Sequence, residues 1–172
     1  LGTRISEETS KLPKPMISVC KKPILYHIME HLSDHGIEEF IICLGYMGYV
    51  IKEYFVNMNY HNNDIQIDLK TKKIELSEKK NLNWKINLID TGEFTMTGGR
   101  LKKIKEYLDD DDFIFTYGDG LSNVNVSNLV KFHKSHKKLA TVTAVKPLGR
   151  YGAIEIDNQS NVKKFSEKPK GD

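Results

Sequence analysis

The stretch FIFTYGDGLS (113–122) has the pattern of a strand followed by a glycine-flanked turn, which is typical of α/β folds. It begins as a short apolar run, typical of a strand over 113–120, and ends in Asp119 between Gly118 and Gly120. In open α/β sheets, ligands bind just beyond the carboxyl ends of the strands. A carboxylate at that place can hold Mg²⁺, which often shares its oxygen ligands with phosphates. Asp-Gly is also an ordinary turn dipeptide, so this stretch alone leaves both interpretations open.

Outward from this stretch, helical and strand-like patterns alternate along the chain. Helices are predicted over 23–32, 49–55, 98–108 and 126–136. Strands are predicted over 38–45, 64–69, 85–90 and 139–145, and an alternating hairpin over 151–157 and 161–167. This order predicts an α/β fold around a mostly parallel sheet. Since there is no internal repeat and no linker rich in Gly, Ser or Pro, a single domain over 1–172 is expected.

The composition is that of an ordinary globular domain. At 172 residues and 39% hydrophobic, the chain is long enough to bury a core. Its net charge of +3 is too small to indicate nucleic-acid wrapping or membrane docking. No run of eighteen apolar residues occurs and no leader precedes Leu1, so a cytoplasmic location is expected. Because the first residue is not Met, we expect a fragment. Cys20 and Cys43 lack metal or redox spacing and are predicted to be buried free thiols.

Two stretches near the start carry cations in settings suited to phosphate. In LGTR (1–4), glycine, a hydroxyl and Arg4 offer backbone amides, a side-chain donor and a forked cation. Lys14 lies between Pro13 and Pro15, whose rings restrict the backbone, so less entropy is lost when the lysine meets an anion. Taken singly, each stretch favours the interpretation of a surface loop with incidental charge.

Other charged clusters favour plain structural interpretations. His27, His31 and His35 recur every four residues, which we interpret as a half-exposed helix face rather than a metal site. The acidic run at 109–112 is interpreted as a solvated loop. The basic run at 100–105 keeps apolar residues at helical spacing, which favours a solvated helix face over an RNA contact.

Taken together, LGTR, LPKPM, TGGRLK, YGDG and FSEKPKGD occur in an order that resembles the sugar nucleotidyltransferase family over essentially the whole chain. The strings GTRISEET, TGGRLK and YGDG are most similar to the glucose-1-phosphate cytidylyltransferase branch. The resemblance implies a Rossmann-like three-layer sandwich, the nucleotide-diphospho-sugar transferase fold. It also implies truncation at both ends. The family's glycine-rich turn reads GGLGTR, of which only LGTR is present here, so the two glycines and the strand before them would be missing. The family's C-terminal segment would be missing as well.

The resemblance assigns roles to individual residues. The nucleotide contacts would be Leu1, Gly2, Thr3, Arg4, Lys14, Thr95, Arg100 and Gly118. Within this set, Arg4 and Lys14 correspond to the catalytic pair that neutralises the triphosphate. Asp119 corresponds to the Mg²⁺ ligand, and the family's second acidic metal ligand would lie beyond residue 172. Glu167 would accept hydrogen bonds from sugar hydroxyls, and Lys168 would hold the sugar phosphate.

The implied reaction is CTP plus glucose 1-phosphate giving CDP-glucose and pyrophosphate, with Mg²⁺ as cofactor. The sugar phosphate would attack the α-phosphate in line. The resemblance further implies a cytoplasmic homo-oligomer in bacterial O-antigen and lipopolysaccharide biosynthesis, with no nucleic-acid or membrane partner. Two alternatives stay open: the same chemistry with UTP or dTTP, and a non-catalytic module of this fold that binds a nucleotide or sugar phosphate.

Overall fold

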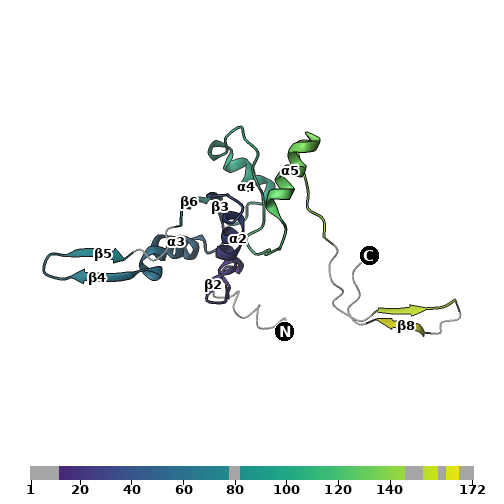
Figure 1. The fold of residues 1–172 in the computed structure, drawn as a ribbon, viewed down its shortest axis with the longest axis horizontal. Helices are drawn as coiled ribbons and strands as arrows, with labels where there is room; N and C mark the ends of the chain where they lie inside the picture. The colour runs from purple at the N-terminus through teal and green to yellow at the C-terminus, as the bar shows by residue number, and fades with distance from the viewer. Residues whose placement is uncertain (1–11, 78–81, 146–152, 159–161, 167–172) are drawn as a thin grey trace. The chain divides into compact units, whose positions relative to one another are not determined.

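The computed structural model describes residues 12–77, 82–145, 153–158 and 162–166 (Figure 1). The chain divides into two compact units, residues 1–127 and 128–172, so the single domain over 1–172 stays a prediction. The elements in chain order are η1 (Lys14–Met16), β1 (Ser18–Val19), β2 (Lys22–Pro23), α2 (Ile24–Ser33), β3 (Glu39–Leu44), α3 (Gly48–Asn62), β4 (Asp64–Asp68), β5 (Lys73–Ser77), β6 (Lys85–Asp90), α4 (Thr97–Lys103), η2 (Lys105–Tyr107), α5 (Val126–His136), β7 (Ala153–Ile156) and β8 (Val162–Ser166).

The parallel pair of β3 and β6 places the molecule in the predicted α/β class. Its register runs from Glu39 opposite Lys85 to Leu44 opposite Asp90. Between the two strands the chain passes through α3 and the antiparallel hairpin of β4 and β5. Parallel neighbours need such a long crossover, since a tight turn can join only antiparallel strands. The predicted hairpin near the end of the sequence is also confirmed, as β7 and β8 pair antiparallel.

Two predicted strands are absent from the described structure. Residues 113–120 and 139–145 contain no strand, although their apolar residues suit one. Phe113 and Phe115 are 51% and 53% exposed. A strand exists only where a neighbour accepts and donates its backbone hydrogen bonds. Among the described residues, each sheet consists of two strands, and none of these strands comes from 113–120 or 139–145. These two stretches therefore have no strand beside them to bond with in the part of the chain that the structure describes.

The core of the first unit joins α2 to the parallel pair. Along α2, the residues Leu25, Tyr26, Ile28 and Met29 are buried. The main cluster of buried side chains is Met16, Leu25, Met29, Phe40, Leu44 and Ile51. Burying a side chain of this size contributes about 1.5–3 kcal/mol. These contacts bring η1, α2, β3 and α3 together, and they set the frame for the loops at the carboxyl end of β3.

The cysteine prediction is half wrong. Cys20 is exposed in the turn between β1 and β2, where its φ of 49° is left-handed. An apolar sequence neighbourhood did not bury it because the tight hairpin turn projects into solvent. Cys43 in β3 is half-buried, and burial raises the pKa of its thiol. Separately, no helix among the described residues combines the length and apolarity needed to cross a bilayer.

Candidate functional site

A hollow in the first unit brings together two of the sequence-predicted site residues, Lys14 and Asp119. Its volume is about 400 Å³. The residues that line it are Leu12, Pro13, Lys14, Pro15, Tyr46 and Asp119. One cation and one carboxylate from distant parts of the sequence thus line the same hollow.

The η1 turn presents Lys14 to solvent while its neighbours anchor it. The backbone N–H of Met16 donates to the Pro13 carbonyl at 2.8 Å, and that of Ile17 donates to the Lys14 carbonyl at 3.1 Å. Pro13 and Met16 are buried, whereas Lys14 is exposed. The turn therefore holds the lysine backbone in one conformation and leaves its ammonium group accessible to an anion.

Gly118 allows the loop before Asp119 to pack directly on this turn. A Cβ atom at position 118 would lie 3.2 Å from Pro15 Cγ and 3.8 Å from Leu25 Cδ1. The missing side chain of glycine makes this close approach possible. Asp119, the next residue, is exposed. In the part of the chain that the structure describes, neither the Lys14 ammonium nor the Asp119 carboxylate has a protein hydrogen-bond or ion-pair partner.

Tyr46 is a lining residue that the sequence analysis missed. It lies in the turn between β3 and α3 and is 55% exposed. The signal that points to it is an aromatic residue directly after the glycine that ends a buried strand. Its ring adds an aromatic surface to a hollow that already has a cation and a carboxylate, and aromatic faces stack on nucleobases.

Arg100 is used to hold the carboxyl end of β3. Its Nη1 donates to the Leu44 carbonyl at 2.8 Å and to Thr91 Oγ1 at 2.6 Å, while Nη2 donates to the Glu93 carbonyl at 3.1 Å. Thr91 is fully buried and donates its own hydroxyl to the Leu44 carbonyl at 2.8 Å. The guanidinium group also lies against Gly45, where a Cβ would be 2.6 Å from Nη2. Arg100 therefore supports the turn that carries Tyr46.

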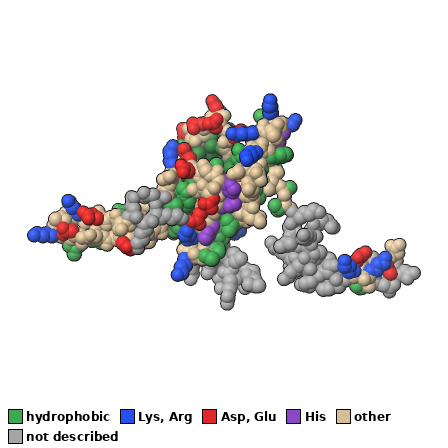
Figure 2. Space-filling view, viewed as in Figure 1, with side chains coloured by type: hydrophobic (Ala, Val, Ile, Leu, Met, Phe, Trp, Pro, Cys, Tyr) green, Lys and Arg blue, Asp and Glu red, His purple; other side chains and the backbone are tan. Residues whose placement is uncertain are grey.

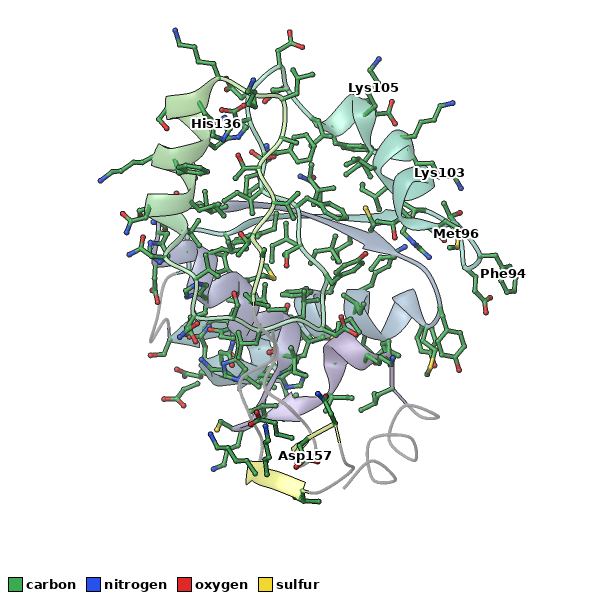
Figure 3. All side chains as sticks on the ribbon, turned by 90° about the vertical axis from the view of Figure 1, so that its right-hand side faces the viewer. Phe94, Met96, Lys103, Lys105, His136 and Asp157 are labelled. Carbon is green, nitrogen blue, oxygen red and sulfur yellow. The ribbon has the colours of Figure 1, made fainter. Side chains whose placement is uncertain are left out.

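Thr95 belongs to the same network rather than to the lining of the hollow. It lies half-exposed in the segment before α4 and accepts a hydrogen bond from Lys103 Nζ at 3.3 Å. Figure 3 shows Lys103 on α4 next to this segment, with Phe94 extending away from the ribbon. Phe94 is 91% exposed. The nucleotide contacts assigned to Thr95 and Arg100 stay predictions, because the described structure places both in a protein network.

Leu1, Gly2, Thr3, Arg4, Glu167 and Lys168 lie outside the described residues.

The donor chemistry at Asp119 fits the predicted Mg²⁺. Among the described residues there is no group of three or more His, Cys, Asp or Glu side chains placed to hold a metal. Mg²⁺ keeps several waters and binds through one or two carboxylates plus substrate phosphates, so it does not require such a cage. A single exposed carboxylate at an open hollow suits a metal shared with a bound phosphate.

The family profile and the similar proteins that the comparisons find all belong to the nucleotidyl transferases. The nucleotidyl transferase family profile matches residues 1–172. Glucose-1-phosphate cytidylyltransferase of Salmonella typhimurium is 51% identical over 173 residues, which cover 100% of this chain and 67% of the relative. A probable glucose-1-phosphate cytidylyltransferase of Bacillus subtilis is 39% identical over 171 residues, covering 99% of this chain and 66% of the relative. The chain thus spans about two thirds of the length of these relatives.

Solved structures support the fold. HddC from Yersinia pseudotuberculosis superposes with a TM-score of 0.56 at 24% identity, covering 93% of this chain and 62% of HddC. The same protein complexed with GMP-PN gives the same TM-score at 23% identity. At this identity the likeness is one of fold alone, and it agrees with the parallel pair and α/β class described above.

Proposed function

This chain belongs to the nucleotidyl transferase family, and from that membership we propose that it is a glucose-1-phosphate cytidylyltransferase. The proposed reaction converts CTP and glucose 1-phosphate to CDP-glucose and pyrophosphate. The observation that carries it is the 51% identity, over the whole chain, to a relative that bears this name. The meeting of Lys14 and Asp119 at one hollow supports the proposal, since the reaction brings phosphates to one place.

The chemistry explains why the site is built from charges rather than from a base. A phosphate oxygen of glucose 1-phosphate attacks the α-phosphorus of CTP, and the bond from that phosphorus to the bridging β-phosphate oxygen breaks. Pyrophosphate leaves in line with the attack. Because the nucleophile is already an anion, no proton has to be removed. Catalysis then consists of positioning two polyanions and offsetting their repulsion, which is the role proposed for Lys14 together with Arg4.

Asp119 is proposed to hold Mg²⁺ at the hollow. When bound, the ion would offset negative charge on the phosphate oxygens. Lys14 on the η1 turn is proposed to contact the triphosphate, and Gly118 to keep the two loops in contact. At the sugar end, Glu167 and Lys168 are proposed to bind the hydroxyls and the phosphate of glucose 1-phosphate.

We further propose a cytoplasmic homo-oligomer that acts in bacterial O-antigen and lipopolysaccharide biosynthesis. Exposed apolar side chains on α3 support the oligomer, because such side chains are enriched where subunits meet. They are Tyr49 at 64%, Val56 at 70% and Tyr60 at 45% exposure. Size-exclusion chromatography with light scattering on the full-length protein would measure the number of subunits.

The decisive experiment measures pyrophosphate release by the full-length protein with glucose 1-phosphate, Mg²⁺ and either CTP, UTP or dTTP. We expect kcat/KM with CTP to exceed that with either other nucleotide by about tenfold or more, as a site with hydrogen bonds to the base discriminates strongly. Faster release with UTP or dTTP would instead favour the related uridylyl or thymidylyl activities. CTP binding in a titration without any turnover would favour a non-catalytic binding module.

A further inference from the structure

Three histidines, two on α2 and one in the turn that follows it, each hydrogen-bond to a segment outside the helix. His27 Nε2 lies 2.8 Å from the Val19 carbonyl, and His31 Nε2 lies 2.9 Å from the Val124 carbonyl. His35, in the turn after α2, has its Nδ1 2.9 Å from Ser127 Oγ. Residues four apart lie one above another on a helix, so the spacing seen in the sequence becomes a row of contacts.

Val124 belongs to the segment that directly follows Asp119, and Ser127 lies in the first turn of α5, where that segment ends. Residues 120–125 contain no helix or strand, so no regular backbone hydrogen bonding holds them. Just before this segment, Gly118 packs on Pro15 and Leu25. At its end, Val126 is 5% exposed at the beginning of α5. His31 contacts the segment between these two points at the Val124 carbonyl. Because a carbonyl oxygen can only accept, the ring N–H at Nε2 of His31 is the donor.

Side chains of α2 and of the segment after Asp119 line one hollow together. A second hollow, of about 360 Å³, is lined by His27, Glu30, His31, Asp34, Leu121 and Ser122. Figure 2 shows histidine and carboxylate side chains gathered on the face over α2. His31 Nε2 is hydrogen-bonded to the Val124 carbonyl. Among the described residues, no group of three or more His, Cys, Asp or Glu side chains is placed to hold a metal. The three histidines therefore contact neighbouring segments of the chain, two of them through backbone carbonyls and one through a serine hydroxyl.

We propose that His31 is a positioning residue for Asp119. By donating to the Val124 carbonyl it holds the segment 119–127 on α2, the same helix whose Leu25 meets Gly118 at the other end. The contact of His35 with Ser127 supports the same segment one turn further along. Asp119 then faces the hollow that Lys14 lines. This inference rests on the proposed function, because the proposed task of Asp119 is to hold the metal for phosphate transfer.

The test compares His31→Leu with His31→Gln in the full-length protein. Leucine has a similar size but no donor, whereas the glutamine amide can donate from a position close to that of Nε2. For His31→Leu we expect kcat to fall about fivefold and the dissociation constant of Mn²⁺, measured by electron paramagnetic resonance with CTP present, to rise about fivefold. That factor corresponds to the loss of one hydrogen bond. His31→Gln should recover most of both changes.

Controls make the outcome decisive. His61→Leu, on the exposed part of α3, is the matched histidine control and should leave Mn²⁺ binding unchanged. Ser127→Ala removes the partner of His35 and should shift Mn²⁺ binding in the same direction by a smaller factor, which keeps the proposal testable if His31→Leu fails to fold. Equal Mn²⁺ binding in the Leu and Gln variants would overturn it. If the unaltered protein released no pyrophosphate from CTP, the proposed function would fail, while Mn²⁺ binding would still decide the role of His31.

Discussion

Two groups of charged side chains lie close to the carboxyl end of β3, and the protein uses them in opposite ways. Arg100 and Lys103 donate to oxygens of the chain itself, among them the Leu44 and Thr91 carbonyls at 2.8 Å each. Lys14 and Asp119 are exposed, have no protein partner among the described residues and line one hollow. The first group stabilises a turn, and the second is available to a ligand.

This difference shows that a charged residue in a motif has to be judged by its partners. A cation whose donors are already bound to backbone carbonyls contributes to the scaffold, and removing it leaves buried acceptors unsatisfied. An exposed cation without partners contributes little to stability, and its charge can meet a bound phosphate. The two groups should therefore respond differently to mutation.

The largest effect is expected on turnover, from Lys14→Ala. A single positioned electrostatic donor is worth about 3 kcal/mol, so kcat for pyrophosphate release should fall about 10²-fold or more. The urea midpoint should hardly move, because the side chain is exposed. Lys52→Ala on the exposed face of α3 is the matched control. Near-normal turnover in Lys14→Ala would remove Lys14 from the catalytic set.

The second effect is expected on stability, from Thr91→Val. Valine keeps the shape of the fully buried side chain but removes the hydroxyl that binds the Leu44 carbonyl and accepts from Arg100. The free energy of unfolding should fall by about 1–3 kcal/mol, measured by urea denaturation. Thr91→Ser retains the hydroxyl and should lose less. A Val variant as stable as the parent would show that this network is not what holds the turn.

The smallest effect is expected from Gly118→Ala, which acts on the contact between the two loops of the hollow. The new Cβ would lie 3.2 Å from Pro15 Cγ, so the η1 turn must shift by a few tenths of an ångström. We expect a loss of about 1 kcal/mol in stability and a several-fold rise in KM for CTP. Gly120→Ala is the comparison, because nothing lies within 4 Å of a Cβ there. Equal stability losses in the two variants would contradict the assigned contact.

Much of the local structure could be predicted from residue patterns. The helical spacing before Gly36 located α2, a short apolar run located β3 and an alternating pattern located β6, because these signals depend only on neighbouring residues. The same reasoning failed at 113–120 and 139–145. Their composition suits strands, but a strand also needs a hydrogen-bonded neighbour, which a local pattern does not supply.

In the candidate site too, some features follow from the local sequence and others only from the tertiary structure. The order of the motifs and the family resemblance singled out Lys14 and Asp119, because a proline-flanked lysine and a glycine-flanked aspartate suit phosphate and Mg²⁺ but each also suits an ordinary loop. Packing decided that they share a hollow, that Tyr46 joins them and that Arg100 instead binds the end of β3. The reason is physical: the chemistry of a side chain belongs to its own residue, whereas its neighbours in space follow from apolar contacts such as Pro15 on Gly118 between distant segments.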